Sequence, residues 1–514
     1  MTTSLPFDPS DLLPYTPAAM RKRIPASALA ALSRDMPAPA SLALEGETDR
    51  ASLLIRFFLL GEALTEAKLR EALPSLDSRD GLIRVGSTED ETGVHGSGAV
   101  SHTAAEDAPA GDVCGAGDEL RYACPFQITA YEVGPRRTAY FAHDAGALQG
   151  NVLAPDHVMG IGGATRTLAS LTHYEEGQSV LDLGTGCGFH AILAALAGAH
   201  VVATDISTRG LEFARFNARL NGVDIDWREG SLFEPVAGES FDVVVSNPPF
   251  VITPAPVREV LGEMEYRDAS LSGDSLVETV VRGIGKHLTP AGRGYLLANW
   301  EIPEGSEWYE RPESWTGSAD SLLIQRDLLE PEQYVETWIR DGGLRPGSPE
   351  FAAAYRAWLG DFHTRGVEAV GFGYVLLGAA DAGVHVHTEL RGSAPANPRE
   401  YVERVWSQRA LAAGGEFPAH ARLVATDVAE HRFYSPGAED PWLIKFTQTD
   451  SFGEEVLAST ELAGFVSVCD GELTAGQITA ALAQLLGQEA AQIEDKIGPD
   501  VVRMVRLGML VEKK

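Results

Sequence analysis

Three features are scarce in this 514-residue sequence: cysteine, basic charge and long apolar runs. Its four cysteines are scattered without the close pairs that a zinc site or a disulfide framework requires, so we expect free thiols and no metal. No basic N-terminus followed by an apolar run is present, and no window of about eighteen uncharged apolar residues, so we expect a cytoplasmic protein without a membrane span. The excess of acids, 73 Asp and Glu against 41 Lys and Arg, disfavours duplex DNA as a partner.

The length of the chain and the changes of pattern along it predict three domains. Residues 1–150 combine short helices with a hairpin, which suggests a winged helix interrupted at 86–117 by an acidic segment for which we expect disorder. Residues 151–380 alternate strands and helices, and residues 381–514 end in two helices, at 474–486 and 497–507, and a strand that again suggest a winged helix. Such modules bind nucleic acid, a protein or only their neighbouring domain, and the order of elements does not choose among these.

The central region predicts an α/β fold with a doubly wound, mostly parallel sheet. Short, nearly continuous apolar runs of the kind found in strands buried on both faces occur at 180–183, 201–203, 241–245 and 295–298. A helix is expected between Ser207, a capping residue, and Gly222. Two more strand-like runs, 321–325 and 371–377, flank a helix-rich stretch and are expected to pair as a final hairpin. In such folds ligands bind at the carboxyl ends of the strands.

A glycine-rich turn follows the first of these strands in the sequence VLDLGTGCG. Gly184, Gly186 and Gly188 suit a turn that needs unusual backbone angles and that a ligand approaches closely. Their G-x-G-x-G spacing departs from the G-x-G-x-x-G of nicotinamide dinucleotide sites, because Phe189 stands at the sixth position. Asp205 ends the next strand, where a carboxylate can accept hydrogen bonds from both hydroxyls of a ribose.

The strand-like run at 241–245 leads directly into the sequence SNPPF. The side-chain oxygen of Asn247 and the carbonyl of Pro248 can accept both N–H bonds of a planar nitrogen and so localise its lone pair for a displacement reaction. The prolines, Pro248 and Pro249, fix the backbone that aims this carbonyl, and Phe250 offers a flat apolar face for stacking. Asn-Pro also initiates ordinary turns, so the motif alone leaves a purely structural role open.

The turn, the acidic strand end and NPPF occur in the order and at the spacing of class I S-adenosylmethionine-dependent methyltransferases, which residues 151–377 resemble. The resemblance implies S-adenosyl-L-methionine as the cofactor and Asn247, Pro248, Pro249 and Phe250 as the catalytic set. It implies a cofactor-binding set of Asp182, Gly184, Thr185, Gly186, Gly188, Asp205, Ile206, Ser231 and Leu232. In that set Ser231 stands where the family often has an acid near the adenine amino group.

The sequence downstream of the tetrapeptide is similar to that of the release-factor glutamine methyltransferase group. It contains SGDSL at 272–276 and then HLTPAGRGYLL. This similarity implies methylation of a glutamine side-chain amide in a protein, with the translation machinery as a candidate partner. Small ribosomal-RNA guanine methyltransferases also carry NPPF, so methylation of an exocyclic base amine in rRNA, tRNA or DNA stays open. A third alternative is a scaffold that binds the cofactor without catalysis.

Overall fold

The computed structural model describes residues 6–32, 34, 36–77, 82–85, 120–134, 137–145, 154–261, 273–379 and 382–513. The acidic segment predicted at 86–117 lies outside these residues. The chain folds into two compact units, of which the first takes in Met1–Gly163, Glu175–Pro235 and Glu263–Tyr266, and the second Ala164–Tyr174, Val236–Gly262 and Arg267–Lys514. Among the described helices, none is long and apolar enough to cross a membrane.

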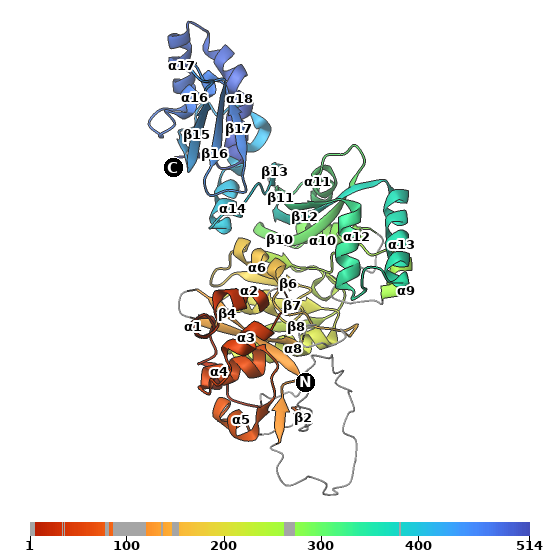
Figure 1. Cartoon of the computed structure of the whole chain (residues 1–514). Helices are drawn as coiled ribbons and strands as arrows, with labels where there is room; N and C mark the ends of the chain where they lie inside the picture. The colour runs from red at the N-terminus through yellow and green to blue at the C-terminus, as the bar shows by residue number, and fades with distance from the viewer. Residues whose placement is uncertain are drawn as a thin grey trace. The chain divides into compact units, whose positions relative to one another are not determined.

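The first unit opens with short helices followed by small antiparallel sheets (Figure 1). Its helices are α1 (Pro17–Arg23), α2 (Ala26–Leu32), α3 (Ala38–Ala43), α4 (Arg50–Leu54), the π-helical turn η2 (Ile55–Leu59) and α5 (Glu66–Ala72). The strands β1 (Leu64–Thr65), β2 (Ile83–Val85) and β3 (Arg121–Ala123) form one sheet in the order β1-β3-β2, and β4 (Phe126–Val133) pairs with β5 (Arg137–Asp144). The predicted hairpin is therefore confirmed, whereas the assignment of this region to a winged helix stays a prediction.

The same unit continues with three parallel strands in the order β6-β7-β8, separated by two helices. These elements are β6 (Ser179–Leu183), α7 (Phe189–Leu196), β7 (His200–Asp205), α8 (Thr208–Asn221) and β8 (Asp226–Glu229). Helix α8 begins and ends where the sequence predicts, because the Ser207 hydroxyl accepts a hydrogen bond from the main-chain nitrogen of Gly210 and Gly222 adopts the left-handed conformation. Alternation of parallel strands with helices confirms the α/β class for this part of the chain.

Two asparagines of α8 fasten strand β5 to this helix. The Asn217 amide accepts from the main-chain nitrogen of Ala142 at 2.6 Å and donates to its carbonyl at 2.9 Å. One turn further along, the Asn221 amide makes the same pair of bonds with Tyr140, at 2.9 and 2.7 Å. Each side chain satisfies both main-chain groups of one residue. The main-chain N–H and C=O groups of Tyr140 and Ala142, on the edge of β5 that does not pair with β4, are therefore hydrogen-bonded.

The second unit contains a mixed sheet in the order β13-β11-β12-β10-β9. Its strands are β9 (Phe241–Ser246), β10 (Leu288–Pro303), β11 (Ser321–Leu329), β12 (Val367–Gly378) and β13 (His385–Glu389). Strand β9 is parallel to β10, whereas β10 and β11 both pair antiparallel with β12, which confirms the predicted final hairpin. Helices of this part are α6 (Gly163–Leu171), α9 (Ala255–Leu261), α10 (Ser275–Lys286), α11 (Glu310–Thr316), α12 (Pro331–Asp341) and α13 (Pro349–Arg365).

Helices α12 and α13 are inserted between the two strands of that final hairpin. They pack on each other and, through the buried side chains of Val335, Ile339, Trp358 and Phe362, on the segment that follows β9. That segment contributes Val251, Ile252 and Val257 to the same apolar cluster. The insertion therefore supports the backbone immediately downstream of the NPPF tetrapeptide.

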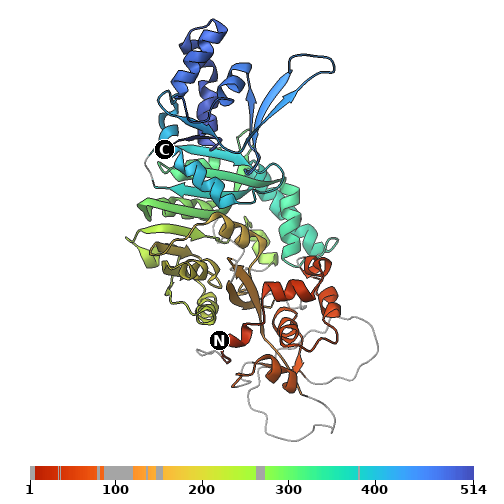
Figure 2. The ribbon, with the colours of Figure 1, turned by 90° about the vertical axis from the view of Figure 1, so that its left-hand side faces the viewer.

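The C-terminal part of the second unit combines a three-stranded and a two-stranded sheet with helices. Its strands are β14 (Leu423–Ala425), β15 (Val428–Phe433), β16 (Leu443–Gln448), β17 (Glu455–Ala458) and β18 (Leu510–Glu512), and its helices α14 (Pro398–Ser407), α15 (Arg409–Ala412), α16 (Thr460–Val466), α17 (Ala475–Leu486) and α18 (Ala490–Arg506). Figure 2 shows the β15–β16 hairpin extending away from these helices, and Trp442 near its turn is 67% exposed. The predicted helix at 474–486 is confirmed, whereas α18 begins seven residues before the predicted start at 497.

Candidate active site

The glycine-rich turn between β6 and α7 has the backbone that its sequence predicts. Gly184, Gly186 and Gly188 have φ angles of 71°, 54° and 86°, a region that favours glycine. A Cβ added to Gly184 or Gly186 would meet no atom within 4 Å, so the space above the turn is open. At Gly188 an added Cβ would lie 3.1 Å from the Cβ of Ala214, which shows that this third glycine allows α7 and α8 to approach each other. The first two glycines thus leave main chain accessible to a ligand, and the third serves helix packing.

Asp182 lies beneath this turn and is buried. Its carboxylate accepts hydrogen bonds from the Thr185 hydroxyl at 2.6 Å and from the main-chain nitrogen of Ala191 at 2.9 Å. Burial raises the pKa of Asp182 to about 7, against the opposing effect of these two donors, and the nearby charge of Asp205 raises it further. Asp182 therefore joins the turn to the first turn of α7.

Asp205 connects the turn to the end of β7. One oxygen accepts from the main-chain nitrogen of Gly186 at 2.7 Å, and the other from that of Ser207 at 2.8 Å. Since each carboxylate oxygen has two acceptor positions, two such bonds leave capacity for further donors such as ribose hydroxyls. The neighbouring Ile206 is 70% exposed, so a flat apolar surface lies beside the carboxylate.

The segment around Ser231 and Leu232 is a tight turn anchored to the same strand end. The main-chain nitrogen of Gly230 donates to the carbonyl of Asp205 at 3.0 Å, and that of Glu234 donates to the carbonyl of Ser231. Leu232 has a φ of 47°, which is unusual for a residue with a side chain and marks local strain. The structure thus brings the predicted cofactor residues of this unit together around Asp205, with Ser231 and Leu232 both half-buried.

In the second unit, the NPPF tetrapeptide follows β9 directly, and the Asn247 amide is held from one side. Its nitrogen Nδ2 donates to the hydroxyl oxygen of Thr165, on α6, at 3.2 Å. Its oxygen Oδ1 is buried and accepts no hydrogen bond within the described part of the chain. A buried carbonyl oxygen without a donor is costly. Asn247 therefore presents an acceptor that a substrate N–H can satisfy.

Tyr334, on α12, is a residue of this site that the sequence pattern did not single out. Its buried hydroxyl accepts from the main-chain nitrogen of Ile252 at 2.8 Å and from the Asn299 amide on β10 at 2.9 Å. The one signal in the sequence is the number of aromatic residues in the helix-rich stretch between the strand-like runs 321–325 and 371–377. Tyr334 fixes the chain two residues after the tetrapeptide.

A cavity of about 320 Å³ lies beside Phe250, entirely within the second unit. Its walls include Phe250, Trp338 of α12 and Phe372 of β12, with Arg326 and Asp327 of β11 also lining it. The Phe250 ring meets those of Trp338 and Phe372 nearly edge to face, with centroids 6.2 and 6.3 Å apart. The tetrapeptide therefore adjoins a mainly apolar cavity, with three aromatic rings in its walls, of a size that suits a small ligand or a side chain.

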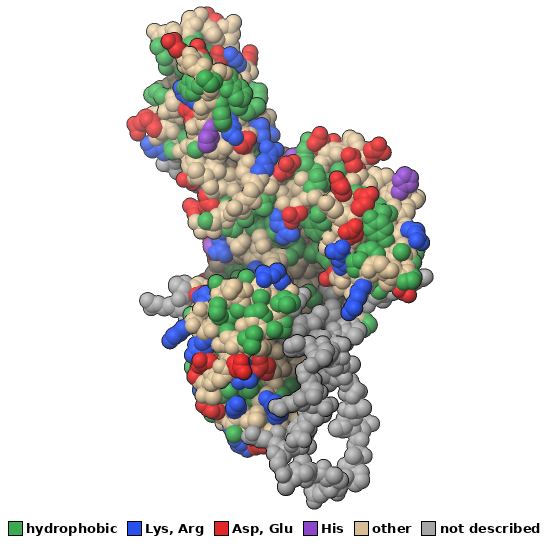
Figure 3. All heavy atoms as spheres, viewed as in Figure 1, with side chains coloured by type: hydrophobic (Ala, Val, Ile, Leu, Met, Phe, Trp, Pro, Cys, Tyr) green, Lys and Arg blue, Asp and Glu red, His purple; other side chains and the backbone are tan. Residues whose placement is uncertain are grey.

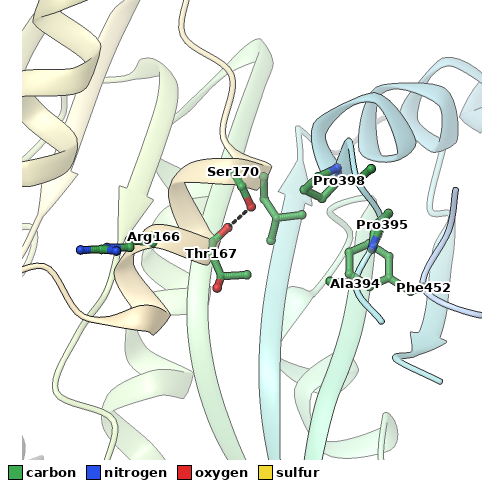
Figure 4. A pocket seen from close by; sticks show the side chains of 9 residues that line it. Arg166, Thr167, Ser170, Ala394, Pro395, Pro398 and Phe452 are labelled. Atoms are coloured by element: carbon green, nitrogen blue, oxygen red, sulfur yellow. Dashed lines mark hydrogen bonds between the residues drawn. The ribbon is translucent and has the colours of Figure 1, made fainter. Parts of the chain in front are cut away.

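A second cavity of about 320 Å³ lies on α6, between this helix and the proline-containing segment 394–398 (Figure 4). Ser170, whose hydroxyl donates to the carbonyl of Thr167, faces Pro395 and Phe452 across it. The Arg166 side chain extends away from these apolar residues. Because this cavity contains no residue of the tetrapeptide, we assign the acceptor site to the cavity beside Phe250.

The surface charge gives little support to a nucleic-acid partner. On the face that Figure 3 shows, the acidic and basic side chains of the described residues lie interspersed and do not gather into one basic area. Several of the arginines are also neutralised by neighbouring acids, as in the ion pairs of Arg228 with Asp226 and of Arg326 with Asp327. This face therefore lacks the concentrated positive charge that phosphate backbones favour.

Comparisons with known proteins identify families that match parts of this chain. The family described as methyltransferase small domain matches residues 159–265, and a domain of unknown function, DUF7059, matches residues 13–97. A release factor glutamine methyltransferase of Xylella fastidiosa is 35% identical over 144 residues, 26% of this chain and 52% of that protein. A ribosomal protein uL3 glutamine methyltransferase of Bradyrhizobium diazoefficiens is 32% identical over 175 residues, 31% of this chain and 53% of that protein.

The chain thus spans about half the length of these curated relatives. Among solved structures, the 16S rRNA N2 G1207 methyltransferase of T. thermophilus, in complex with AdoMet and guanosine, is 16% identical and covers 55% of this chain and 65% of its own, with a TM-score of 0.26. That score is too low to bear on the substrate. The family match and the glutamine methyltransferase relatives confirm the resemblance to class I methyltransferases that the glycine turn and NPPF predict, and they locate it in the central region of the chain.

Proposed function

We propose that this protein transfers a methyl group from S-adenosyl-L-methionine to the side-chain amide nitrogen of a glutamine in a protein of the translation machinery. The observation that carries the proposal is the fixed Asn247 amide, whose nitrogen is anchored on Thr165 while its buried oxygen accepts no hydrogen bond from the described residues. The names of the relatives, which refer to glutamine in release factors and in a ribosomal protein, support the same substrate class.

The residues of the first unit fit the proposed cofactor. Open space above Gly184 and Gly186 admits a ligand close to the main chain, and the Asp205 carboxylate lies at the end of β7, where it can accept from ribose hydroxyls beside the exposed Ile206. Bound there, S-adenosyl-L-methionine would supply an electrophilic methyl group on a positively charged sulfur. Asp182 and Thr185 satisfy each other, so we assign them to holding the turn in shape.

The acceptor side has the groups that a planar amide nitrogen requires. In an amide the nitrogen lone pair is delocalised into the carbonyl and is a poor nucleophile. Acceptance of one N–H by Asn247 Oδ1, and of the other by the carbonyl of Pro248, draws the lone pair out of that plane and toward the incoming carbon. Formation of the new N–C bond would be matched by cleavage of the bond between the methyl carbon and the cofactor sulfur, whose electron pair would stay on the sulfur and leave it neutral. One of the two N–H protons would leave the nitrogen for water, and the fixed acceptors would stabilise the positive charge that develops on the nitrogen.

The alternative of an exocyclic base amine rests on the same tetrapeptide and is separated from the proposal by one experiment. Cell extract is incubated with the protein and a cofactor labelled in its methyl group, and portions are then digested with nuclease or with protease. We expect the label in macromolecules to resist nuclease, to be released by protease and to yield N5-methylglutamine on mass spectrometry. Label released by nuclease would contradict the proposal in favour of the base amine, and the Asn247→Ala variant controls for methylation by other enzymes.

A further inference from the structure

The cavity beside Phe250 is built by residues that a methyltransferase sheet alone would not provide. Trp338 comes from the α12–α13 insertion, and together with Phe250 and Phe372 it forms three aromatic walls within the second unit. The two ring contacts of Phe250 are edge to face, so the rings support one another and define a fixed apolar space. Such walls favour an apolar side chain over a charged group.

A β-bulge directs Arg326 to this cavity. In the pairing of β11 with β12, Gln325 faces Gly373 and Asp327 faces Phe372, so Arg326 is the extra residue of β11. A Cβ on Gly373 would lie 1.8 Å from the carbonyl oxygen of Ile324, which means that only glycine permits the close approach of the strands here. Bulges re-aim a side chain in this way, and they are common beside active sites.

The charge of Arg326 is already balanced. Its Nε lies 2.5 Å from a carboxylate oxygen of Asp327, and both residues line the cavity. A nucleotide in this cavity would bring its phosphate close to the Asp327 carboxylate, without an unpaired cation among the described lining residues to offset the repulsion. The lining therefore favours a peptide, which is uncharged along its main chain.

Trp338 carries a further polar group beside this cavity. Its indole Nε1 is buried and has no hydrogen-bond acceptor among the residues that the structure describes. An indole nitrogen only donates, so its partner must be an acceptor atom such as a carbonyl oxygen. Main-chain carbonyls of a peptide supply such an oxygen at every residue.

From these observations we infer that the cavity is a specificity subsite for a protein acceptor. It holds a large apolar side chain next to the methylated glutamine, while Trp338 Nε1 donates to a main-chain carbonyl of the same segment. The inference rests on the proposed function and adds a sequence preference to it. Trp338 acts here as a specificity-determining residue.

A peptide library tests this preference. Proteolytic peptides of a whole cell proteome are methylated by the wild type, and the positions of N5-methylglutamine are mapped by mass spectrometry. We expect Leu, Ile, Met or Phe to be enriched about tenfold at one position beside the glutamine, the discrimination that burial of one such side chain provides. The Trp338→Ala variant should lose the enrichment because KM for the apolar peptides rises. Its kcat should change by less than about threefold, since the lost contact binds the ground state and the transition state equally.

Two further variants complete the design. Trp338→Phe keeps an aromatic wall but removes the N–H, so the enrichment should persist while KM rises about tenfold for all peptides. Trp442→Ala removes an exposed tryptophan of the β15–β16 hairpin and should behave as the wild type. Methylated glutamines without apolar enrichment, or an enrichment that survives in Trp338→Ala, would overturn the subsite and leave the proposed function intact. Methyl label in nuclease-sensitive material only, with no methylated glutamine in proteins or peptides, would overturn both.

Discussion

The hydroxyl of Tyr334 lies 2.8 Å from the main-chain nitrogen of Ile252 and thereby ties the inserted helix α12 to the chain just after the NPPF tetrapeptide. The Asn299 amide donates to the same oxygen. The insertion is thus bonded both to the segment that follows β9 and to strand β10. Its removal would affect the tetrapeptide as well as the cavity wall.

Tyr334→Phe should reveal this link. The substitution leaves the Ile252 N–H and the Asn299 amide without their acceptor, so we expect the free energy of unfolding to fall by about 1–3 kcal/mol. Urea denaturation measures the loss, and kcat should fall with it because the tetrapeptide is less well fixed. Tyr355→Phe on the neighbouring α13 is the matched control, since Tyr355 is only half-buried. Equal stabilities of the two variants would contradict the role given to the Tyr334 hydroxyl.

Thr165→Val should reduce turnover without weakening cofactor binding. Valine has nearly the shape of threonine but cannot accept from Asn247 Nδ2, so the amide loses its orientation. We expect kcat to fall about tenfold, the cost of one hydrogen bond in the transition state. Thr165→Ser retains a hydroxyl and should keep most activity. A Thr165→Val enzyme with wild-type kcat would show that Asn247 is positioned by other means.

Asn247→Ala should cost more, about 10²–10³ in kcat, because it removes the acceptor itself. Cofactor affinity, measured by calorimetry, should remain the same. Phe250→Tyr keeps the ring and should keep most activity, whereas Phe250→Ala should chiefly raise KM for the acceptor. If the Asn247→Ala enzyme turns over at the wild-type rate, the tetrapeptide is a turn without catalytic function.

Asp205→Ala should weaken binding of S-adenosyl-L-methionine by tenfold or more, on the order of the loss of one charge-assisted hydrogen bond. The variant also removes the acceptor of the Gly186 and Ser207 main-chain nitrogens. The glycine-rich turn should therefore be less well ordered, which lowers the affinity further. Calorimetry measures the affinity, and Asp226→Ala, at the exposed start of β8, is the control for removal of an acid from this unit. Equal affinities in both variants would place the ribose elsewhere.

Asp182 predicts a pH dependence of stability. Its pKa is raised from 3.8 to about 7 in the folded protein, mainly by burial. Between these values the unfolded chain is ionised while the folded chain holds its proton, so the free energy of unfolding should fall as pH rises from about 4 to 7, by up to about 1.4 kcal/mol per pH unit, and level off above 7. Asp182→Asn should remove this slope in urea titrations at several pH values. A slope that persists in that variant would assign it to other groups.

The predictable part of the fold was local in sequence. Apolar runs marked strands β6, β7 and β9, and the Ser207 cap with Gly222 marked both ends of α8, because these signals need no distant partner. Helix α18 was predicted too short since its cap is Glu489, outside the usual capping residues, and Pro499 lies within it. Strand β10 begins at Leu288, well before the apolar run at 295–298 that marked it, because only its buried centre shows the apolar pattern.

The candidate site likewise has one part that the local sequence predicts and one part that depends on tertiary packing. Asp182, Asp205 and the three glycines lie within one strand–turn–helix segment and the strand after it, so their spacing along the chain was sufficient to group them. The partner of Asn247 is 82 residues away along the chain at Thr165, and Tyr334 is 82 residues from Ile252. Such contacts arise from tertiary packing, and no periodicity records them. The bulge at Arg326 was likewise invisible, since it depends on the pairing of β11 with β12.

The two asparagines that hold β5 on α8 determine where the methyltransferase region can be cut from the rest of the chain. A fragment that begins at residue 151 would keep α8 but discard the strand whose main chain Asn217 and Asn221 satisfy. It would also uncover Phe216, whose ring meets that of Phe126. A shorter enzyme for crystallisation or engineering should therefore begin before Phe126, because the β4–β5 hairpin packs on α8 and belongs to the same compact unit.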